Sequence, residues 1–264
     1  MTESAEAVPV TSSTVRMRAV KPLAWFMAFL AAVVLFGFVD LATLPGWVDQ
    51  SYEWAVPLEV SWGALFTFVI AGSYVWIALM PARAWPAVVQ LGIAAAALAV
   101  SSVAGMDGRP LWVAVPLAGS AVLFAWLAGE SAGRFPQAWS VDLPYLLLGV
   151  AGILIWLPYV VRALEISRAG AEGDNTWGIE HWPVQAAAGL SLAGCAAAMA
   201  IWNPGRPLMR LTVSLSATLI GAADLAYPDR NGAMDAPLWG VAVVIWGTAV
   251  ALPLRNGDVL KHWS

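Results

Sequence analysis

The sequence predicts an all-α integral membrane protein, a bundle of about eight transmembrane helices. Of its 264 residues, 60% are hydrophobic and only 11% are charged, and the mean hydropathy is +0.73. A soluble domain carries about 25% charged residues and cannot bury this much apolar surface. The apolar residues also fall in runs of roughly 18–24, the length that a helix needs to cross about 30 Å of hydrocarbon. These observations exclude the soluble two-domain protein that length alone would allow.

Eight apolar segments separated by helix breakers are the expected transmembrane helices. They cover residues 23–44, 57–80, 86–104, 111–129, 143–163, 182–203, 209–226 and 237–254. We expect residues 22–254 to form the membrane domain, with a disordered cytoplasmic tail at 1–21 and a second cytoplasmic tail at 255–264. The N-terminal segment resembles the start of a signal peptide. However, the apolar run that follows is too long for one, so a retained helix is expected.

The Lys and Arg residues predict the orientation in a cytoplasmic (inner) membrane. With the N-terminus inside, the cytoplasmic ones are Arg16, Arg18, Lys21, Arg83, Arg134, Arg206, Arg210, Arg255 and Lys261. The outer ones are Arg109, Arg162, Arg168 and Arg230. This excess inside agrees with the positive-inside rule, and an even number of spans places both termini in the cytoplasm. Acidic residues collect in the outer connections. Either they attract cations, or they simply remain where Lys and Arg are excluded.

The four outer connections share a short pattern, an acidic residue shortly before the proline that opens the next helix. The copies are "EWAVPL", "MDGRPLW", "IEHWPV" and "MDAPLW". The pattern is a helix-start signal, because proline suits the first turn and a carboxylate there faces the positive end of the helix dipole.

Two of these copies match more closely and indicate an internal repeat. "MDGRPLWVAV" at 106–115 resembles "MDAPLWGVAV" at 234–243, and most corresponding spans start about 120–126 residues apart. We therefore predict two parallel four-helix halves, 22–130 and 142–254, related by an axis along the membrane normal. A competing similarity, "VDLATLP" at 39–45 with "ADLAYPD" at 223–229, links spans one and seven and does not fit this period.

The candidate functional residues are ionisable groups at membrane depth, where a charge is costly and calls for an explanation. Asp40, Glu59 and Asp224 qualify, and His181 and Gln185 lie in the first turns of the sixth span at the same level. Together these five residues would line an outward-facing polar cavity that binds a proton or another cation. The alternative is that each side chain reaches the interface or caps a neighbouring helix.

No cofactor, metal ion or catalytic residue is expected. Zinc or copper would use His and carboxylate ligands, but the candidates lie on four separate spans without diagnostic spacing. His262 lies in the predicted cytoplasmic tail, which excludes heme ligation by paired histidines. The single cysteine, Cys195, cannot form an intramolecular disulfide. In the longest connection, Glu172, Asp174 and Asn175 would bind calcium weakly, although such residues usually form turns.

The sequence favours a small transporter or channel-like protein with an outward-facing acidic and histidine site for a proton or cation. A non-catalytic membrane scaffold or assembly subunit is the alternative. The third hypothesis, a membrane enzyme acting on a lipid or envelope precursor, requires Glu59, Ser61 and His181 to converge, and no hydrolase motif is present. Membrane lipids are the expected partners, with a homo-oligomer or a membrane protein partner left open. A net charge of −4 without a basic stripe argues against nucleic acid.

Overall fold

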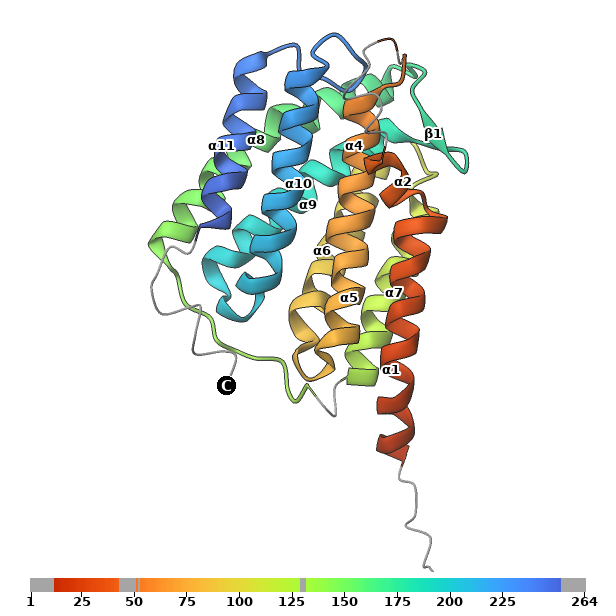
Figure 1. Cartoon of the computed structure of the whole chain (residues 1–264), viewed down its shortest axis with the longest axis vertical. Helices are drawn as coiled ribbons and strands as arrows, with labels where there is room; N and C mark the ends of the chain where they lie inside the picture. The colour runs from red at the N-terminus through yellow and green to blue at the C-terminus, as the bar shows by residue number, and fades with distance from the viewer. Residues whose placement is uncertain (1–11, 43–50, 52, 129–131, 253–264) are drawn as a thin grey trace, which may run out of the picture.

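The structure, a computed structural model, describes residues 12–42, 51, 53–128 and 132–252. In this part of the chain, each of the eight predicted segments is a helix (Figure 1). The long helices are α1 (Ser12–Phe29), continued by η1 (Leu30–Val34); α4 (Val56–Ala64), η2 (Leu65–Ala71) and α5 (Gly72–Leu79) in one run; α6 (Trp85–Ala104), α7 (Leu111–Ala128), α8 (Leu143–Arg168), α9 (His181–Ile201), α10 (Arg206–Ala226) and α11 (Pro237–Ala251). The short elements are α2 (Gly37–Leu41), η3 (Pro81–Arg83), η4 (Asn203–Gly205), β1 (Asn175–Thr176) and β2 (Ile179–Glu180).

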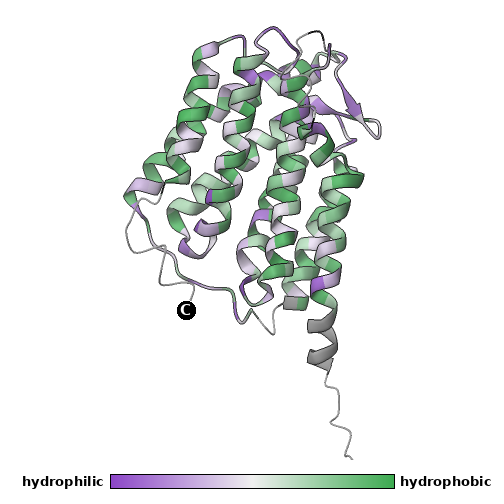
Figure 2. Cartoon of the chain, viewed as in Figure 1, coloured by the Kyte–Doolittle hydropathy of each residue, from purple (hydrophilic) through white to green (hydrophobic). Residues whose placement is uncertain are grey.

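The composition of the helices indicates a membrane location. Five are long and apolar enough to cross a membrane: Val56–Leu79, Trp85–Ala104, Leu143–Arg168, His181–Ile201 and Asn203–Ala226. Three shorter apolar helices accompany them, at Ala19–Val34, Leu111–Leu127 and Pro237–Ala251. Figure 2 shows apolar residues along the helices and hydrophilic residues gathered toward the two ends of the bundle.

Helix α9 occupies the centre of the bundle. It contacts α8, α6, α4 and α10, and most of its residues are buried. Small side chains allow neighbouring helices to approach closely in a membrane. At Gly189 of α9, for example, an added Cβ would lie only 2.8 Å from a methyl group of Val160 in α8. The single cysteine, Cys195, is fully buried within the same helix.

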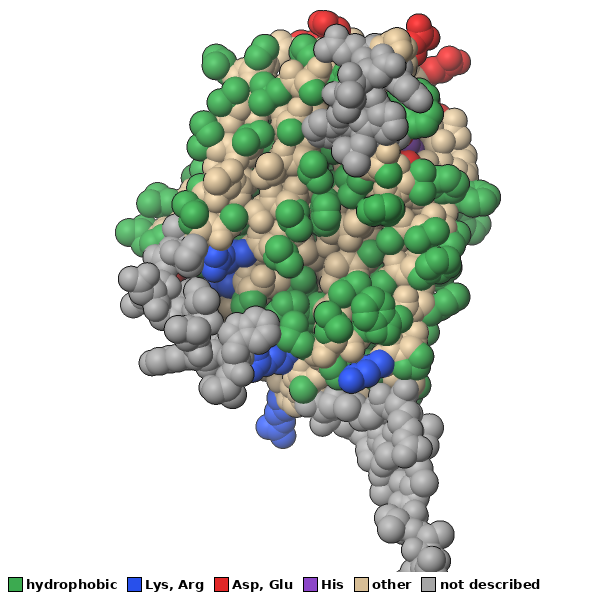
Figure 3. All heavy atoms as spheres, in the orientation of Figure 1, with side chains coloured by type: hydrophobic (Ala, Val, Ile, Leu, Met, Phe, Trp, Pro, Cys, Tyr) green, Lys and Arg blue, Asp and Glu red, His purple; other side chains and the backbone are tan. Residues whose placement is uncertain are grey.

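The two ends of the bundle differ in charge (Figure 3). We call one the hairpin end, because it carries β1, β2 and the connection 227–236. The acidic side chains visible in Figure 3 lie at this end, and the basic ones lie toward the other. We call the opposite end the arginine end. Its described basic residues are Lys21, Arg83, Arg134, Arg206 and Arg210.

The first membrane helix ends earlier than the predicted boundary at residue 44. Phe36 has a left-handed backbone (φ 59°), so the apolar helix ends at Val34 and α2 starts at Gly37. Gly37 packs closely, because a Cβ there would lie 2.7 Å from the Cβ of Phe66. Asp40 therefore lies in α2, beyond the apolar helix that ends at Val34.

The predicted tails coincide only partly with the described chain. Helix α1 begins at Ser12, so residues 12–21 are helical where we expected disorder. Residues 1–11 and the predicted C-terminal tail, 255–264, lie outside the described residues.

A small hairpin closes one side of the hairpin end. Strands β1 and β2 pair antiparallel, and the turn residues Trp177 and Gly178 both have positive φ (55° and 76°). Positive φ at both central residues is the pattern of the tight turns that fit a two-stranded ribbon. The Trp177 indole donates to the Val34 carbonyl at 2.9 Å, and its ring lies edge-on to Phe36 with centroids 6.1 Å apart. The hairpin is thus attached to the last turn of the first membrane helix.

An ion pair at the arginine end joins three helices. Arg206 at the start of α10 lies 3.2 Å from Asp142, the residue before α8, and donates to the Met199 carbonyl of α9 at 2.8 Å. Its guanidinium also lies 4.3 Å from the ring centroid of Tyr145. The paired side chains are only 9% and 11% exposed.

A buried amide joins the middle of the bundle. Gln90 of α6 donates to the Val69 carbonyl at 2.9 Å and to the Ser73 hydroxyl at 3.0 Å. Its carbonyl oxygen accepts a hydrogen bond from the Thr212 hydroxyl of α10 at 3.0 Å. The amide therefore connects three helices at a depth where water cannot replace these bonds.

Candidate functional site

Three carboxyl groups come together at the hairpin end. Glu59 of α4 lies beside Asp174, which directly precedes β1, and the two carboxyl groups interact electrostatically. Asp40 of α2 lies close enough to interact electrostatically with both. Neighbouring carboxylates repel each other when all of them are ionised, and binding a proton or another cation relieves this repulsion.

The environment of Asp40 also favours proton uptake. Asp40 is 6% exposed, and burial is the main cause that raises the pKa of its carboxyl group. The charges of Glu59 and Asp174 raise the pKa further. Burial and the two charges together shift it from 3.8 to about 8. Asp40 thus changes its protonation near neutral pH.

The raised pKa of Asp40 predicts that the protein becomes less stable as the pH rises from about 4 to about 8. In this window the folded state keeps a proton that the unfolded state has lost, so the free energy of unfolding falls with pH. Below about pH 4 both states are protonated and the stabilisation is complete. Asp40→Asn should flatten the dependence of Tm on pH in detergent. The exposed-acid control Asp229→Asn should keep the wild-type slope, and an unchanged slope in Asp40→Asn would contradict the assignment.

His181 fixes the base of the hairpin beside these acids. Its backbone N–H donates to the Asp174 carbonyl at 3.0 Å, and its Nε2 lies 2.9 Å from the Thr176 hydroxyl. The ring stacks on Trp62 of α4 with centroids 4.5 Å apart and is almost fully buried. His181 therefore positions the segment that carries Asp174.

Gln185 and Asp224 serve a different part of the hairpin end. The Gln185 amide donates to the Gly232 carbonyl at 2.7 Å. Asp224 accepts a hydrogen bond from the Met234 backbone N–H, also at 2.7 Å. Both side chains thus hold the connection between α10 and α11, which is also tied to α8 by an ion pair between Arg162 and Asp235.

The structure divides the five sequence-predicted residues into two groups. Asp40 and Glu59 lie together, with His181 next to their third partner, Asp174. Gln185 of α9 and Asp224 of α10 instead bind the backbone of the neighbouring connection, 227–236. The polar residues at the hairpin end therefore form an acid cluster (Asp40, Glu59, Asp174) beside a set of structural hydrogen bonds.

A buried tyrosine of α8 connects α4 with the second of these groups. The Tyr159 hydroxyl is hydrogen-bonded to Ser61 of α4, which itself donates to the Pro57 carbonyl at 2.7 Å. Tyr159 also interacts with the Gln185 side chain and with the charge of Asp224. Among the hydrogen bonds of the described residues, none joins Ser61 to His181, so the arrangement that a hydrolase would need is not observed there.

Arg109 attaches the hairpin from its other side. Its guanidinium pairs with Asp107 at 2.8 Å, lies 3.6 Å from Glu180 and donates to the Gly178 carbonyl at 3.3 Å. Burial alone would raise the pKa of Asp107, but the hydrogen bonds from Arg109 lower it below its ordinary value. Asp107 therefore stays ionised and keeps Arg109 in place against the hairpin.

Asp174, Thr176 and Tyr159 are the residues that sequence reasoning did not assign to the site. In the sequence, Asp174 belongs to a weak calcium candidate with Glu172 and Asn175, and such residues usually form turns. Its position seven residues before His181, in the longest outer connection, was the available signal. Thr176 and Tyr159 gave none, because a single hydroxyl in a loop or an apolar helix has no diagnostic spacing.

Within the described residues, no group of three or more His, Cys, Asp or Glu side chains is arranged to hold a metal ion. Comparison with known protein families, with curated proteins and with solved structures gives no match to this chain. Its function must therefore be argued from the site itself.

Proposed function

We propose that this protein is a small membrane transporter or channel-like protein that binds a proton at the acid cluster Asp40, Glu59 and Asp174. One observation carries the proposal, namely the convergence of the Asp40, Glu59 and Asp174 carboxyl groups, because neighbouring carboxylates repel each other and binding a proton relieves this repulsion. Glu59 lies within the candidate span Val56–Leu79, and ionisable residues in such segments are typical of proton relays in pumps and transporters. Loss of this proton leaves neighbouring negative charges that repel each other or attract another cation.

The proposed topology has eight spans with both termini on the cytoplasmic side of the inner membrane. The five long helices and the three shorter apolar helices supply the eight segments. The described basic residues at the arginine end would face the cytoplasm according to the positive-inside rule. The hairpin end, with its acid cluster, would then face outward.

The neighbour relations of the helices support two parallel halves. In the proposed correspondence, α1 matches α8 and the run α4–α5 matches α9. Likewise, α6 matches α10 and α7 matches α11. Helix α1 packs on α5 as α8 packs on α9, and α6 packs on α7 as α10 packs on α11. Across the halves, α6 contacts α9 and α10 contacts α4, which are corresponding pairs. Repeats of this kind in transporters move against each other around a site at their interface.

Substitution of Glu59 tests the proposal. In liposomes that contain the purified protein and a pH-sensitive dye, Glu59→Gln should reduce proton flux to the level of protein-free liposomes. The change is nearly isosteric, and the amide can still hydrogen-bond to Asp174 but cannot release a proton. The matched control is Glu172→Gln, an exposed acid two residues from Asp174 that should keep wild-type flux. Equal flux in wild type and Glu59→Gln would refute the proposal.

A membrane scaffold or assembly subunit is the second candidate. It is favoured by the roles of Gln185 and Asp224, which bind the backbone of a connection in the manner of structural caps. A scaffold would show no proton flux with any variant and would copurify with a stoichiometric membrane partner. The enzyme hypothesis has no comparable support, because the Ser61 hydroxyl is bonded to Tyr159 and Pro57.

A further inference from the structure

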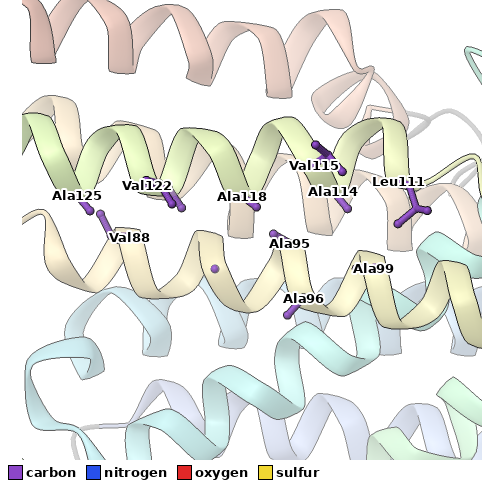
Figure 4. Close-up of a pocket in the computed structure, with 12 residues that line it drawn as sticks. Val88, Ala95, Ala96, Ala99, Leu111, Ala114, Val115, Ala118, Val122 and Ala125 are labelled. Atoms are coloured by element: carbon purple, nitrogen blue, oxygen red, sulfur yellow. The ribbon is translucent and has the colours of Figure 1, made fainter.

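The chain between the two proposed halves crosses the arginine end in residues 132–142, which we call the bridging segment (Figure 1). Helices α6 and α7 lie side by side, with Val88 near Ala125, so the chain that leaves α7 emerges beside the start of α6 (Figure 4). There the Trp85 indole donates to the Gly133 carbonyl at 3.1 Å. The beginning of the bridging segment is thus attached to the first half.

The later part of the bridging segment is bonded to the second half. The Ser140 backbone N–H donates to the Ile201 carbonyl at the end of α9 at 3.0 Å. The Trp202 indole, just after this helix, donates to the Pro136 carbonyl at 2.9 Å. The last carbonyls of a helix have no partner within the helix, so the segment satisfies groups that α9 leaves open. It is therefore attached to both halves.

Phe135 joins the two halves through its ring. The ring stacks on Trp202 with centroids 5.4 Å apart and an interplanar angle of 5°. It also meets Trp85 edge-on, with centroids 5.3 Å apart. Both separations lie in the range of about 4.5–7 Å in which aromatic rings attract each other. We call Trp85, Phe135 and Trp202 the aromatic cluster.

The aromatic cluster covers one end of the contact between the halves. Helix α6 of the first half contacts α9 and η4 of the second half, and Trp202 lies between these two elements and is only 2% exposed. Met199 and Cys195 precede Trp202 by three and seven residues, so they share its face of α9 at increasing depth. Both are buried, and Cys195 lies about 10 Å deeper than Trp202 along the helix.

We propose that the aromatic cluster is a gate that closes the arginine end between the two halves, and that Phe135 leaves Trp202 when the gate opens. The inference rests on the proposed proton transport and deepens it. A transporter that binds its proton at the hairpin end has to keep the opposite end closed, and its halves move against each other to change sides. Because the bridging segment is bonded to both halves, such a movement breaks its contacts with one of them.

Labelling of Cys195, the single thiol of the chain, tests the gate without a transport measurement. Phe135→Ala removes both ring contacts and should raise the rate at which a small maleimide labels Cys195 in detergent about tenfold. Phe135→Tyr keeps the ring and should label at the wild-type rate. The matched control is Val141→Ala, which truncates an exposed side chain of the same segment and should also leave the rate unchanged.

Each variant is labelled at the same interval below its own Tm, so that global unfolding contributes equally to every rate. A wild-type labelling rate in Phe135→Ala would show that the rings only pack, and would overturn the proposal. An equal rise in Val141→Ala would overturn it too, because truncation anywhere in the segment would then be sufficient. The liposome assay separates this proposal from the proposed function. Absence of proton flux in wild type would refute transport, whereas faster labelling of Phe135→Ala alone would still show a gate at this end.

Discussion

Replacing Arg206 by Met is expected to lower the free energy of unfolding by about 3–5 kcal/mol, because it leaves the nearly buried Asp142 carboxylate without its partner. The hydrogen bond to the Met199 carbonyl is lost as well. Asp142→Leu should cost a similar amount, since the Arg206 guanidinium would then be buried without a counter-ion. Denaturant titration or thermal unfolding in detergent measures both effects.

The double variant distinguishes a buried pair from general damage at the arginine end. With both charges removed, Arg206→Met with Asp142→Leu should recover most of the stability lost in the single variants. Lys21→Met provides a control, because Lys21 is an exposed charge at the same end and its loss should change stability by less than about 0.5 kcal/mol. Single variants that cost no more than Lys21→Met would disprove the role of the pair.

Replacing Gln90 by Leu is expected to lower the free energy of unfolding by about 2 kcal/mol. Three interhelical hydrogen bonds disappear, and such bonds average about 0.6 kcal/mol each in a membrane protein. The effect should be visible in detergent as a lower Tm and as a steeper loss of folded protein on heating. The Val69 carbonyl and the Thr212 hydroxyl also lose partners that water cannot replace at this depth.

Ser216→Ala is the matched control for Gln90. The Ser216 hydroxyl is buried in the same bundle but has no hydrogen-bond partner among the described residues. Its removal should leave Tm nearly unchanged. If Gln90→Leu and Ser216→Ala behaved alike, the Gln90 amide would not be holding the helices together.

The positions of the helices follow from the sequence because they depend on local features. The predicted 57–80 and 86–104 correspond to Val56–Leu79 and Trp85–Ala104, since apolar runs and prolines set both ends. The break near Phe36 could not be predicted, because neither Gly nor Pro occupies positions 35 and 36, where the helix is interrupted. It results from tertiary packing, in which Gly37 is pressed against Phe66 of another helix.

The sequence predicts that Asp40, Glu59 and His181 lie toward the same end of the bundle, but it does not predict which side chains meet. The direction of the Asp224 side chain depends on the rotation of α10 about its axis. In the structure this side chain accepts a hydrogen bond from the Met234 backbone N–H. Asp174 reaches Glu59 because the hairpin folds back over the bundle, a contact between segments more than a hundred residues apart.

Because Cys195 is completely buried, motion of the hairpin can be followed with labels on introduced cysteines. A lone thiol enclosed in the centre of α9 is shielded from labelling reagents. A cysteine introduced at exposed Glu172, just before the hairpin, can therefore receive a spin label or fluorophore without prior removal of the native one. Paired with a second label at exposed Asp229, it would report the distance between the hairpin and the connection 227–236 as the pH changes.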